Sequence, residues 1–457
     1  AALGGAARRC ARCACRAAPP RRVPCAAKAL LAAACLAKML HRLAAEIHGP
    51  DLISQLAADV VEMLGGGLLD GADREGVLRA HAPEPDARAA VLAGGRPAVY
   101  PPLLLFHWEA AGAALVDHLR AANGSAVPFL RELGQREDVD MGLAVVPVPM
   151  TLKSAWEALC GIPASLTSDF REHGSALRRY CLPRVLARCC GYHSILAKTD
   201  TMLPHLPRRV FGFDEVVVAP TNAELAERLR ARLSAAGALE GQRPALVYVY
   251  AGDAHAPYEP GRVATSERGY SPNVVEDVFL ALSRRADDLA RQVAQYWPPP
   301  QFGRASPGVE HGMAFYFGDH GESLQDGAPP HGHLVAPEVT QVLLAAERRG
   351  CPLRGAPEGG SPGRLRRLAD IFSTVMDCVG LRADGPLHVG ESLLRESTRE
   401  VMASFSFYRP TERLALHFAR GGARGIETVQ FTRGRDGWAA ASTNGDAPAP
   451  PDAAQAD

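Results

Sequence analysis

Carboxylates and imidazoles follow three short apolar runs of the sequence. In chain order, the run Leu103–Phe106 precedes Glu109, the run 245–250 precedes Asp253 and His255, and the run 313–317 precedes Asp319 and His320. Short apolar runs rich in aromatic and aliphatic residues are typical of buried strands. In parallel sheets the chemistry collects beyond the carboxyl ends of the strands. Carboxylate oxygens and imidazole nitrogens together suit Zn²⁺ or Mn²⁺, so the sequence predicts a metal-dependent site at these strand ends.

The elements that would position these residues alternate along the chain. A fourth apolar run, at 215–219, follows a helical stretch, and helical patterns fill segments between the runs, at 115–121, 154–159, 222–236 and 274–296. Strands that alternate with helices predict an α/β fold with a mostly parallel sheet covered on both faces.

The bulk composition indicates a globular protein of enzyme size. The 457 residues are 47% apolar, enough for one large core or two moderate ones. Fifty basic and fifty acidic residues cancel, so no global field favours nucleic acid as a partner.

The N-terminal region has a different composition. Residues 1–28 contain six Arg and one Lys, and the first acid is Glu46. Such a start resembles a transit peptide or the cytoplasmic flank of a membrane anchor. The apolar stretch 29–40 is too short to span a bilayer, and a hydrophobic segment upstream stays open. We interpret residues 1–45 as a targeting or membrane-flanking segment and residues 46–97 as a helical lead-in.

The eleven cysteines do not fix the redox compartment. Cys10, Cys13 and Cys15 are spaced like metal ligands but lie in the Arg- and Ala-rich segment without a nearby His, which favours an unstructured targeting segment. The other cysteines show no disulfide-framework spacing.

Five segments resemble, in the same order, motifs of one group of enzymes. They are Glu109 with Val127–Leu130, Pro149–Gly161, Ala254–Tyr258, Phe317–Ser323 followed by His331 and Gly332, and Gly390–Leu394. These motifs are similar to those of phosphoethanolamine transferases, lipoteichoic acid synthases and sulfatases, the sulfatase-like branch of the alkaline phosphatase superfamily. The resemblance implies a three-layer αβα sandwich over residues 98–380 and a small C-terminal subdomain over 381–440. The tail 441–457, with its prolines and no apolar period, predicts no structure.

The resemblance also implies the site. One divalent cation, Zn²⁺ or Mn²⁺ with Ca²⁺ as a further candidate, would lie between Glu109, Thr151, Asp319 and His320. Thr151 would be the nucleophile, since a Thr hydroxyl needs a metal or a base to become an alkoxide. The remaining catalytic candidates are His255 and His331, facing the phosphate oxygens and able to supply a general acid, and Lys153, an oxyanion partner. His333 has no assigned role.

Alternatives remain at two of these residues and in the function. Thr151 could be only a helix N-cap, and Glu109 a surface acid that caps the helix near 113–121. The functions considered are transfer or hydrolysis of phosphate-type esters through a phosphothreonine, sulfuric-ester hydrolysis, and head-group binding without catalysis. Sulfatases use formylglycine made from Cys or Ser, so Thr151 favours phosphoryl chemistry.

Departures from the family pattern affect the substrate contacts more than the metal centre. Ala110–Ala113 replaces the family's Ser-x-Arg-Ala-Asp, and Ala155 stands where the motif has Arg. The expected partner is a phospholipid- or glycan-type ester, with membrane association through the N-terminal region. The expected location is membrane-associated or secretory, with organellar targeting as a further hypothesis. The oligomeric state is open.

Overall fold

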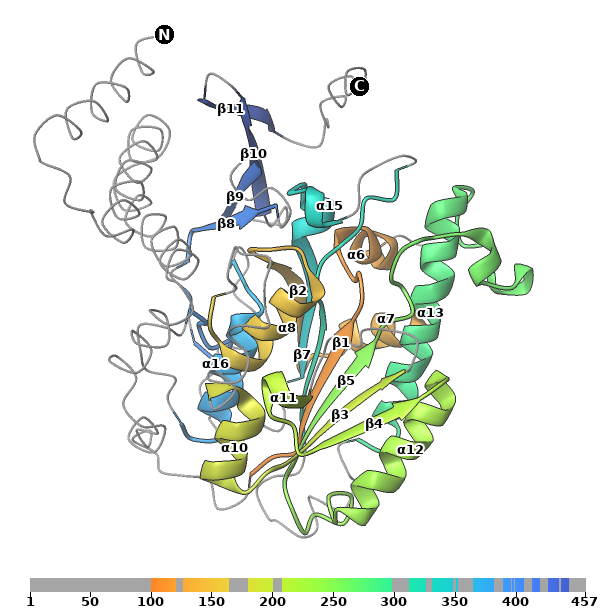
Figure 1. The fold of residues 1–457 in the computed structure, drawn as a ribbon, viewed down its shortest axis with the longest axis vertical. Coiled ribbons are helices and arrows are strands. Elements are labelled where there is room, and N and C mark those ends of the chain that lie inside the picture. Colours follow the sequence, from red (N-terminus) through yellow and green to blue (C-terminus); the bar gives the residue numbers. More distant parts are fainter. Residues whose placement is uncertain are drawn as a thin grey trace, which may run out of the picture.

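The computed structural model describes most of the chain from Tyr100 onward (Figure 1). The described residues are 100–120, 126–163, 180–199, 208–297, 312–325, 331–347, 351, 365–381, 389–395, 397, 399–406, 413–419, 426–434 and 437–443. The predicted targeting segment 1–45, the lead-in 46–97 and most of the tail lie outside them.

A seven-stranded sheet forms the centre of the molecule. Its strands are β1 (Leu103–Trp108), β2 (Val139–Val145), β3 (His193–Thr199), β4 (Glu215–Ala219), β5 (Ala245–Ala251), β6 (Met313–Gly318) and β7 (Gln341–Glu347). The strand order is β2-β7-β6-β1-β5-β3-β4. The neighbours from β6 to β4 run parallel, and β7 is antiparallel to both of its partners. The prediction of a mostly parallel α/β sheet is confirmed.

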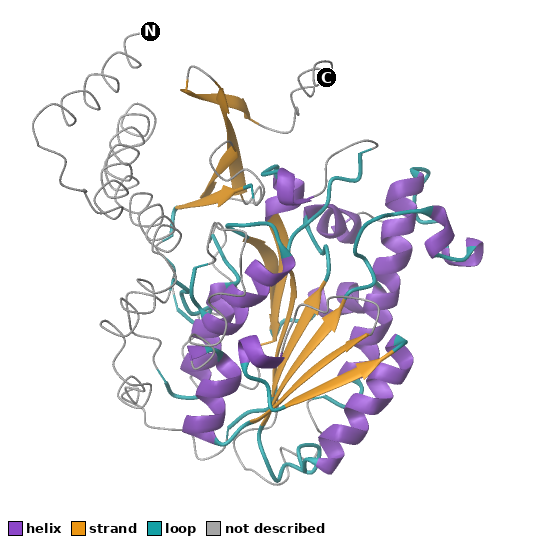
Figure 2. Ribbon diagram, viewed as in Figure 1, coloured by secondary structure: helices purple, strands orange, loops and turns teal. Residues whose placement is uncertain are grey.

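Helices cover both faces of this sheet (Figure 2). Residues of α8 (Thr151–Cys160), α10 (Leu182–Cys190), α11 (Arg208–Phe211) and α16 (Ala369–Cys378) pack into the core on one face. Residues of α6 (Ala113–Arg120), α7 (Pro128–Gly134), α12 (Asn222–Ala235) and α13 (Val274–Ala294) pack into the core on the other. Strand β1 shows why two cores form: Leu103 and Leu105 enter the first and Leu104 and Phe106 the second, as the two-residue period of a strand requires.

The long, strongly periodic elements match their predicted bounds closely. The helix predicted over 222–236 spans 222–235, and the strand predicted over 215–219 spans those same residues. The helix predicted to begin near Ser154 begins instead at Thr151, which makes Thr151 part of its first turn.

A second, four-stranded antiparallel sheet follows in the predicted C-terminal subdomain. Its strands are β8 (Val401–Phe405), β9 (Arg413–Ala419), β10 (Ile426–Gly434) and β11 (Gly437–Thr443), in the order β11-β10-β9-β8. Strand β11 continues three residues into the tail for which the sequence predicts no structure. Within the described ranges, no helix is long and apolar enough to cross a membrane.

Within the part of the chain that the structure describes, six cysteines pair in three disulfides, although their spacing gives no framework. The pairs are Cys160–Cys181, Cys189–Cys190 and Cys351–Cys378. The first ties the end of α8 to the residue before α10, and the third ties the end of α16 to the segment after β7. Both fasten helices of the same layer to their surroundings.

Candidate metal centre

The strand register brings two carboxylates together at the carboxyl end of the sheet. Strands β1 and β6 pair in parallel, with Trp108 opposite Gly318, so the next residues are Glu109 and Asp319. Both side chains are fully buried. The hypothesis that Glu109 is a surface acid is therefore wrong.

The turn after β1 holds Asp319 through backbone donors. Ala110 has a φ of 58°, in the left-handed region that non-glycine residues rarely adopt. In this conformation its N–H donates to Asp319 Oδ1 at 2.9 Å, and the N–H of His320 donates to the same oxygen at 2.9 Å. A strained residue next to a buried acid is typical of functional sites.

Thr151 faces this pair from the first turn of α8. Its Oγ1 lies 3.4 Å from Glu109 Oε2 and 3.4 Å from His320 Nε2. The N-cap residue is Met150, which makes no side-chain cap, so the N-cap hypothesis for Thr151 is wrong. Gly161 ends the helix at a φ of 65°, which explains a glycine at that place in the motif.

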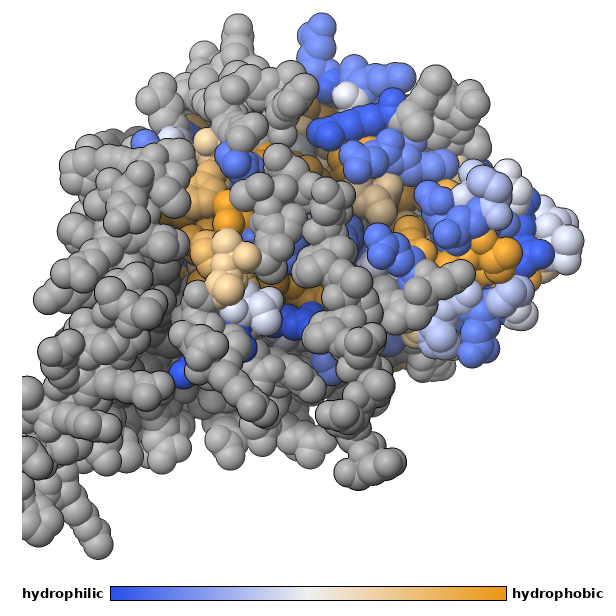
Figure 3. Space-filling model, turned by 90° about the horizontal axis from the view of Figure 1, so that it is seen from above, coloured by the Kyte–Doolittle hydropathy of each residue, from blue (hydrophilic) through white to orange (hydrophobic). Residues whose placement is uncertain are grey.

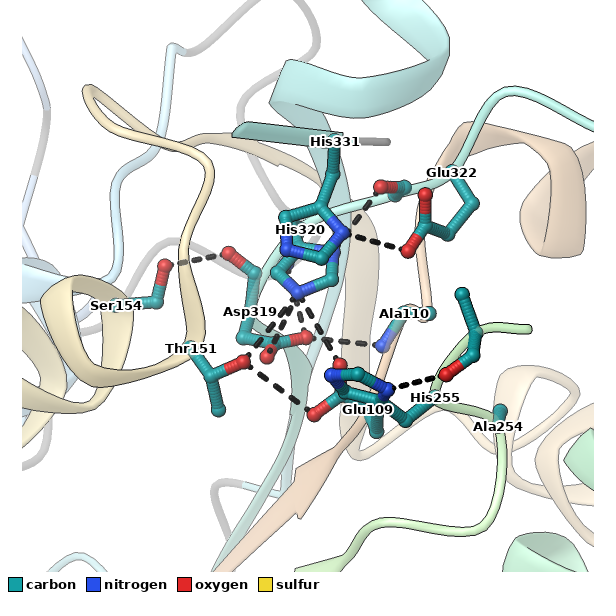
Figure 4. Close-up of polar contacts among 12 residues, drawn as sticks. Glu109, Ala110, Thr151, Ser154, Ala254, His255, Asp319, His320, Glu322 and His331 are labelled. Carbon is teal, nitrogen blue, oxygen red and sulfur yellow. Dashed lines mark hydrogen bonds and ion pairs between the residues drawn. The ribbon is translucent and has the colours of Figure 1, made fainter. Parts of the chain in front are cut away.

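Four side chains converge on one point (Figure 4). His320 Nε2 lies 3.2 Å from Glu109 Oε1 and 3.4 Å from Asp319 Oδ2. The two Thr151 contacts and these two separations lie between 3.2 and 3.4 Å, with Glu109 contributing one oxygen to Thr151 and the other to His320. The four residues are therefore close enough to share one divalent cation.

Two of the converging oxygens also lack hydrogen bonds. Glu109 Oε1 and Asp319 Oδ2 are buried and accept none from the described residues. Buried carboxylate oxygens without donors are costly unless a cation or a charged partner compensates them. The donor set Glu109, Thr151, Asp319 and His320 therefore fits a divalent cation.

The electrostatics of the four residues agree with that fit. Burial alone would lower the pKa of His320, but the carboxylates of Asp319 and Glu109 raise it to about 10. Burial alone would raise the pKa of Asp319, but His320 and His107 hold it well below its usual value. The two acids thus demand compensating positive charge, and a bound cation would take the place of the His320 proton.

The other predicted histidines lie beside the four residues. The ring of His331 stacks on that of His320 with centroids 3.6 Å apart, and the ring of His255 lies edge-on to His331 at 6.3 Å. His331 Nδ1 contacts Glu322 Oε1 at 2.6 Å, which leaves Nε2 for another partner. His255 Nδ1 lies 2.6 Å from the carbonyl oxygen of Ala256.

The positions of Lys153 and His333 follow from the elements that carry them. Lys153 is buried in the first turn of α8, two residues after Thr151. The backbone carbonyl of His333 accepts a hydrogen bond from Arg413 at 2.9 Å, which ties the turn that carries His331 to β9.

Sequence reasoning missed three residues that surround the carboxylates. Tyr250 donates a short hydrogen bond to Glu109 Oε2. His107 Nε2 lies 3.3 Å from Asp319 Oδ2, and its Nδ1 lies 2.5 Å from the hydroxyl of Tyr248. The two-residue period of a strand could have found them, because His107 precedes Glu109 by two and the tyrosines alternate along β5.

Close backbone packing explains the glycine after the Asp-His pair. A β-carbon on Gly321 would lie 1.8 Å from the carbonyl oxygen of Glu338, so a larger residue would displace the segment that carries His320.

Figure 3 views the molecule from the carboxyl end of the main sheet, where hydrophilic residues are exposed beside hydrophobic ones.

Comparison with solved structures shows which fold this is. The chain is similar to an alkaline phosphatase superfamily protein from Vibrio parahaemolyticus, with 14% identity, coverage of 81% of this chain and 90% of that one, and a TM-score of 0.51. It is similar to the lipoteichoic acid synthase LtaP from Listeria monocytogenes, with 13% identity, coverage of 82% and 92%, and a TM-score of 0.52. A candidate sulfatase from Bacteroides thetaiotaomicron has 12% identity, coverage of 74% and 84%, and a TM-score of 0.50.

No family model matches the sequence, and no curated protein matches it. What the solved structures show is the fold: the chain has the fold of the alkaline phosphatase superfamily, as its motifs predict.

Proposed function

We propose that the protein is a metal-dependent transferase or hydrolase of phosphate-type esters that passes a phospho-alcohol group through Thr151. The observation that carries the proposal is the position of the Thr151 hydroxyl, 3.4 Å from both Glu109 Oε2 and His320 Nε2. A hydroxyl used only in packing or capping would not face a buried acid and a buried imidazole. The likeness in fold to a lipoteichoic acid synthase supports this class of reaction.

A divalent cation held by Glu109, Thr151, Asp319 and His320 would favour the alkoxide of Thr151 and offset charge on the phosphoryl group. The same donor set admits Zn²⁺ and Mn²⁺.

The protein's own residues carry out the remaining work. Thr151 Oγ1 attacks phosphorus while its proton passes to Glu109 Oε2. The Oγ1–P bond forms as the bond from phosphorus to the alcohol oxygen breaks, and His331 or His255 protonates the departing alcohol. A second alcohol or a water then gives a proton to that imidazole and attacks phosphorus. The Oγ1–P bond breaks, and Thr151 recovers its proton from Glu109.

Two further features would hold the anionic group. The first turn of α8 presents backbone N–H groups beside Thr151, an arrangement that favours phosphate. Lys153 lies in the same turn, and we assign it the oxyanion role that Arg has in sulfatases. The residue type at position 151 separates this function from sulfuric-ester hydrolysis, because Thr cannot become formylglycine.

We further propose that the protein folds in an oxidising, extracytoplasmic compartment. Cys160–Cys181 and Cys351–Cys378 join segments 21 and 27 residues apart, and such crosslinks persist where thiols are not kept reduced. The substrate would then be a phospholipid- or glycan-type ester at the cell surface. Counting free thiols in protein isolated from its native compartment tests the location, and fully reduced cysteines would contradict it.

The covalent step is tested by intact-peptide mass spectrometry after adding a phosphodiester or phospholipid donor to the full chain. A mass increment on the peptide that contains Thr151 is expected. Thr151→Ala should fold and lose at least about a thousandfold in activity, because the cation cannot replace an oriented nucleophile. Thr151→Ser should keep part of the activity, since only a methyl is removed.

The matched control is Thr221→Ala. Thr221 is a helix N-cap whose hydroxyl oxygen accepts from the N–H of Glu224, so its loss should lower stability by about 1 kcal/mol and leave activity unchanged. Full activity in Thr151→Ala, or turnover of sulfate esters alone, would overturn the proposal. Cation binding without turnover of any ester would favour a non-catalytic head-group-binding protein.

A further inference from the structure

The two buried carboxylates each contact a side chain that lies behind them in the sheet. Glu109 Oε2 accepts from the hydroxyl of Tyr250, and Asp319 Oδ2 is 3.3 Å from His107 Nε2. His107 is in turn 2.5 Å from the hydroxyl of Tyr248. All three supporting side chains are buried.

The hydrogen-bond roles around His107 follow from its two contacts. The Tyr248 hydroxyl can donate to Nδ1, which places the ring proton on Nε2, facing the Asp319 carboxylate. The opposite tautomer would set a nitrogen lone pair against a carboxylate oxygen. Nε2 lies 3.3 Å from Asp319 Oδ2. Neither atom has an aligned hydrogen bond within the described residues, so the contact between them is one of charge and proximity.

His107 is also fixed by its neighbours. Its ring stacks on Phe317 with centroids 5.2 Å apart and meets Tyr250 edge-on at 4.9 Å. Packing against Phe317 and Tyr250 and the contact at Nδ1 together restrict rotation of the ring away from Asp319. His107 on β1 alternates with Glu109 just after it, and Tyr248 alternates with Tyr250 on the neighbouring strand β5, so the support is built into two adjacent strands.

We propose that His107, oriented by Tyr248, is the positioning residue for Asp319, and that Tyr250 is the positioning residue for Glu109. The inference rests on the proposed metal site. His107, Glu109 and Asp319 offer ligand atoms within 4.8 Å of one another, and the inference assigns His107 to positioning Asp319 and not to the cation itself. Side chains that hold metal ligands in place raise the affinity for the cation, because the ligands are already ordered before the cation binds. Removing one such side chain lowers the affinity roughly tenfold to a hundredfold.

The test measures Zn²⁺ and Mn²⁺ affinity of the full chain by competition with a chelating dye. His107→Leu should bind the cation roughly tenfold to a hundredfold more weakly, with an unfolding midpoint of the cation-free protein close to that of the wild type. His107→Gln should recover most of the affinity, because its amide N–H can replace Nε2–H. Tyr248→Phe and Tyr250→Phe should each weaken binding.

Tyr192→Phe is the matched control. Tyr192 is equally buried, and its hydroxyl donates to the carbonyl of Pro101 at 2.6 Å, at the opposite end of β1. Its affinity for the cation should equal that of the wild type. Absorption of the Co²⁺-loaded protein supplies a second readout, because a displaced carboxylate changes the ligand field even where affinity changes little.

Each alternative outcome is distinct. If the wild type binds no divalent cation, the proposed function fails together with this inference. If the wild type binds and His107→Leu binds equally well, only the inference fails. X-ray absorption that counts two imidazoles on the cation would make His107 a ligand and overturn the positioning role. If His107→Leu does not fold, the cation affinities of Tyr248→Phe and Tyr250→Phe are compared with that of Tyr192→Phe. Equal affinities in all three variants would contradict the positioning roles.

Discussion

His331 has a carboxylate on one side and an imidazole on the other. Glu322 contacts its Nδ1 at 2.6 Å, and His320 stacks on its ring at 3.6 Å. Burial alone would raise the pKa of Glu322, but the hydrogen bond and charge of His331 lower it. An ionised Glu322 fixes the His331 ring through Nδ1 and leaves Nε2 for another partner, as the partner of a general acid should.

Removing that carboxylate should slow turnover and leave the cation in place. We expect Glu322→Ala to lower kcat roughly tenfold to a hundredfold, and Glu322→Gln to lower it less because the amide oxygen still accepts from Nδ1–H. Steady-state kinetics and metal content of the same preparations measure both effects. Glu267→Gln, which disrupts an exposed pair with Arg285, is the control.

Loss of metal in Glu322→Ala would contradict this assignment. His320, Glu322 and His331 also offer ligand atoms within 4.8 Å of one another. Metal loss would therefore indicate that Glu322 is a ligand of an ion and not a residue that orients His331.

At the scale of elements, one arginine organises the loop that follows β5. Arg262, in the 3₁₀ turn η2 (Pro260–Arg262), donates to the carbonyls of Asp253 at 3.0 Å and Pro257 at 2.9 Å, and also to that of His255. The two terminal nitrogens of the planar guanidinium reach these carbonyls from separate, fixed positions, a geometry that the compact ammonium of Lys does not reproduce. His255 therefore depends on Arg262 for its place.

We expect Arg262→Lys to reduce kcat/KM by about tenfold, since a misplaced catalytic group costs rate without changing its chemistry. Limited proteolysis with chymotrypsin, read at Tyr258, should show faster cleavage of this loop. Arg228→Lys is matched, because Arg228 also donates to a backbone carbonyl, that of Val218, outside the site. Unchanged cleavage and kinetics in Arg262→Lys would show that the loop keeps its conformation without the contacts of Arg262.

The elements that could be predicted from the sequence are those whose hydrophobic pattern matches their burial in the fold. Strand β5 is apolar throughout and α12 is amphipathic, so both follow from the sequence. Strand β7 (Gln341–Glu347) was missed because its Leu, Ala and Glu residues favour a helix, whereas burial in the sheet interior decides the outcome. Strand β2 was missed because Asp140 and Gly142 interrupt its apolar pattern.

The candidate site divides in the same way. Residues in motifs, such as Thr151 and Asp319, could be predicted as site residues because their spacing resembles a family pattern. His107 lies in no motif. The two-residue period of the strand could have placed it on the same side as Glu109, but its contact with Asp319, which is distant in sequence, follows only from the strand register. The disulfides were missed because connectivity cannot be deduced from spacing.

At the scale of the whole molecule, the C-terminal sheet supports the site from above the main sheet (Figure 1). Ser406 donates to the carbonyl of Gly332 at 3.0 Å, and Arg413 to that of His333 at 2.9 Å. Both contacts fix the 3₁₀ turn η4 (His331–His333). The position of His331 therefore depends on the packing of one sheet against the other.

A chain of hydrogen bonds through His417 joins the two sheets. The side chain of Gln341 donates to Thr428 Oγ1 at 3.1 Å, and Thr428 contacts His417 Nδ1 at 2.9 Å. His417 Nε2 contacts Ser404 Oγ at 2.9 Å, and Ser404 donates to the carbonyl of Val146 at 2.7 Å. With Ser404 donating onward, its oxygen accepts from Nε2–H, so Nδ1 must accept from Thr428. The chain is complete only with a neutral imidazole.

Acid should therefore weaken the packing of the two sheets. Burial lowers the pKa of His417 from 6.5 to about 3. Between these values the unfolded chain binds the proton and the folded chain does not, so stability rises with pH in this window and is lost as pH falls from about 6.5 toward 3. At pH 5 the loss from this residue is about 2 kcal/mol.

Urea unfolding of the full chain at pH 7.5 and pH 5, for the wild type and His417→Gln, measures the loss of stability that comes from protonation of His417. The glutamine does not titrate and keeps a donor and an acceptor, so the variant should lose about 2 kcal/mol less than the wild type on acidification. Other titrating groups cancel in the difference between the two proteins. Equal losses in both would mean that His417 accepts a proton without breaking the chain, and that the two sheets pack independently of it.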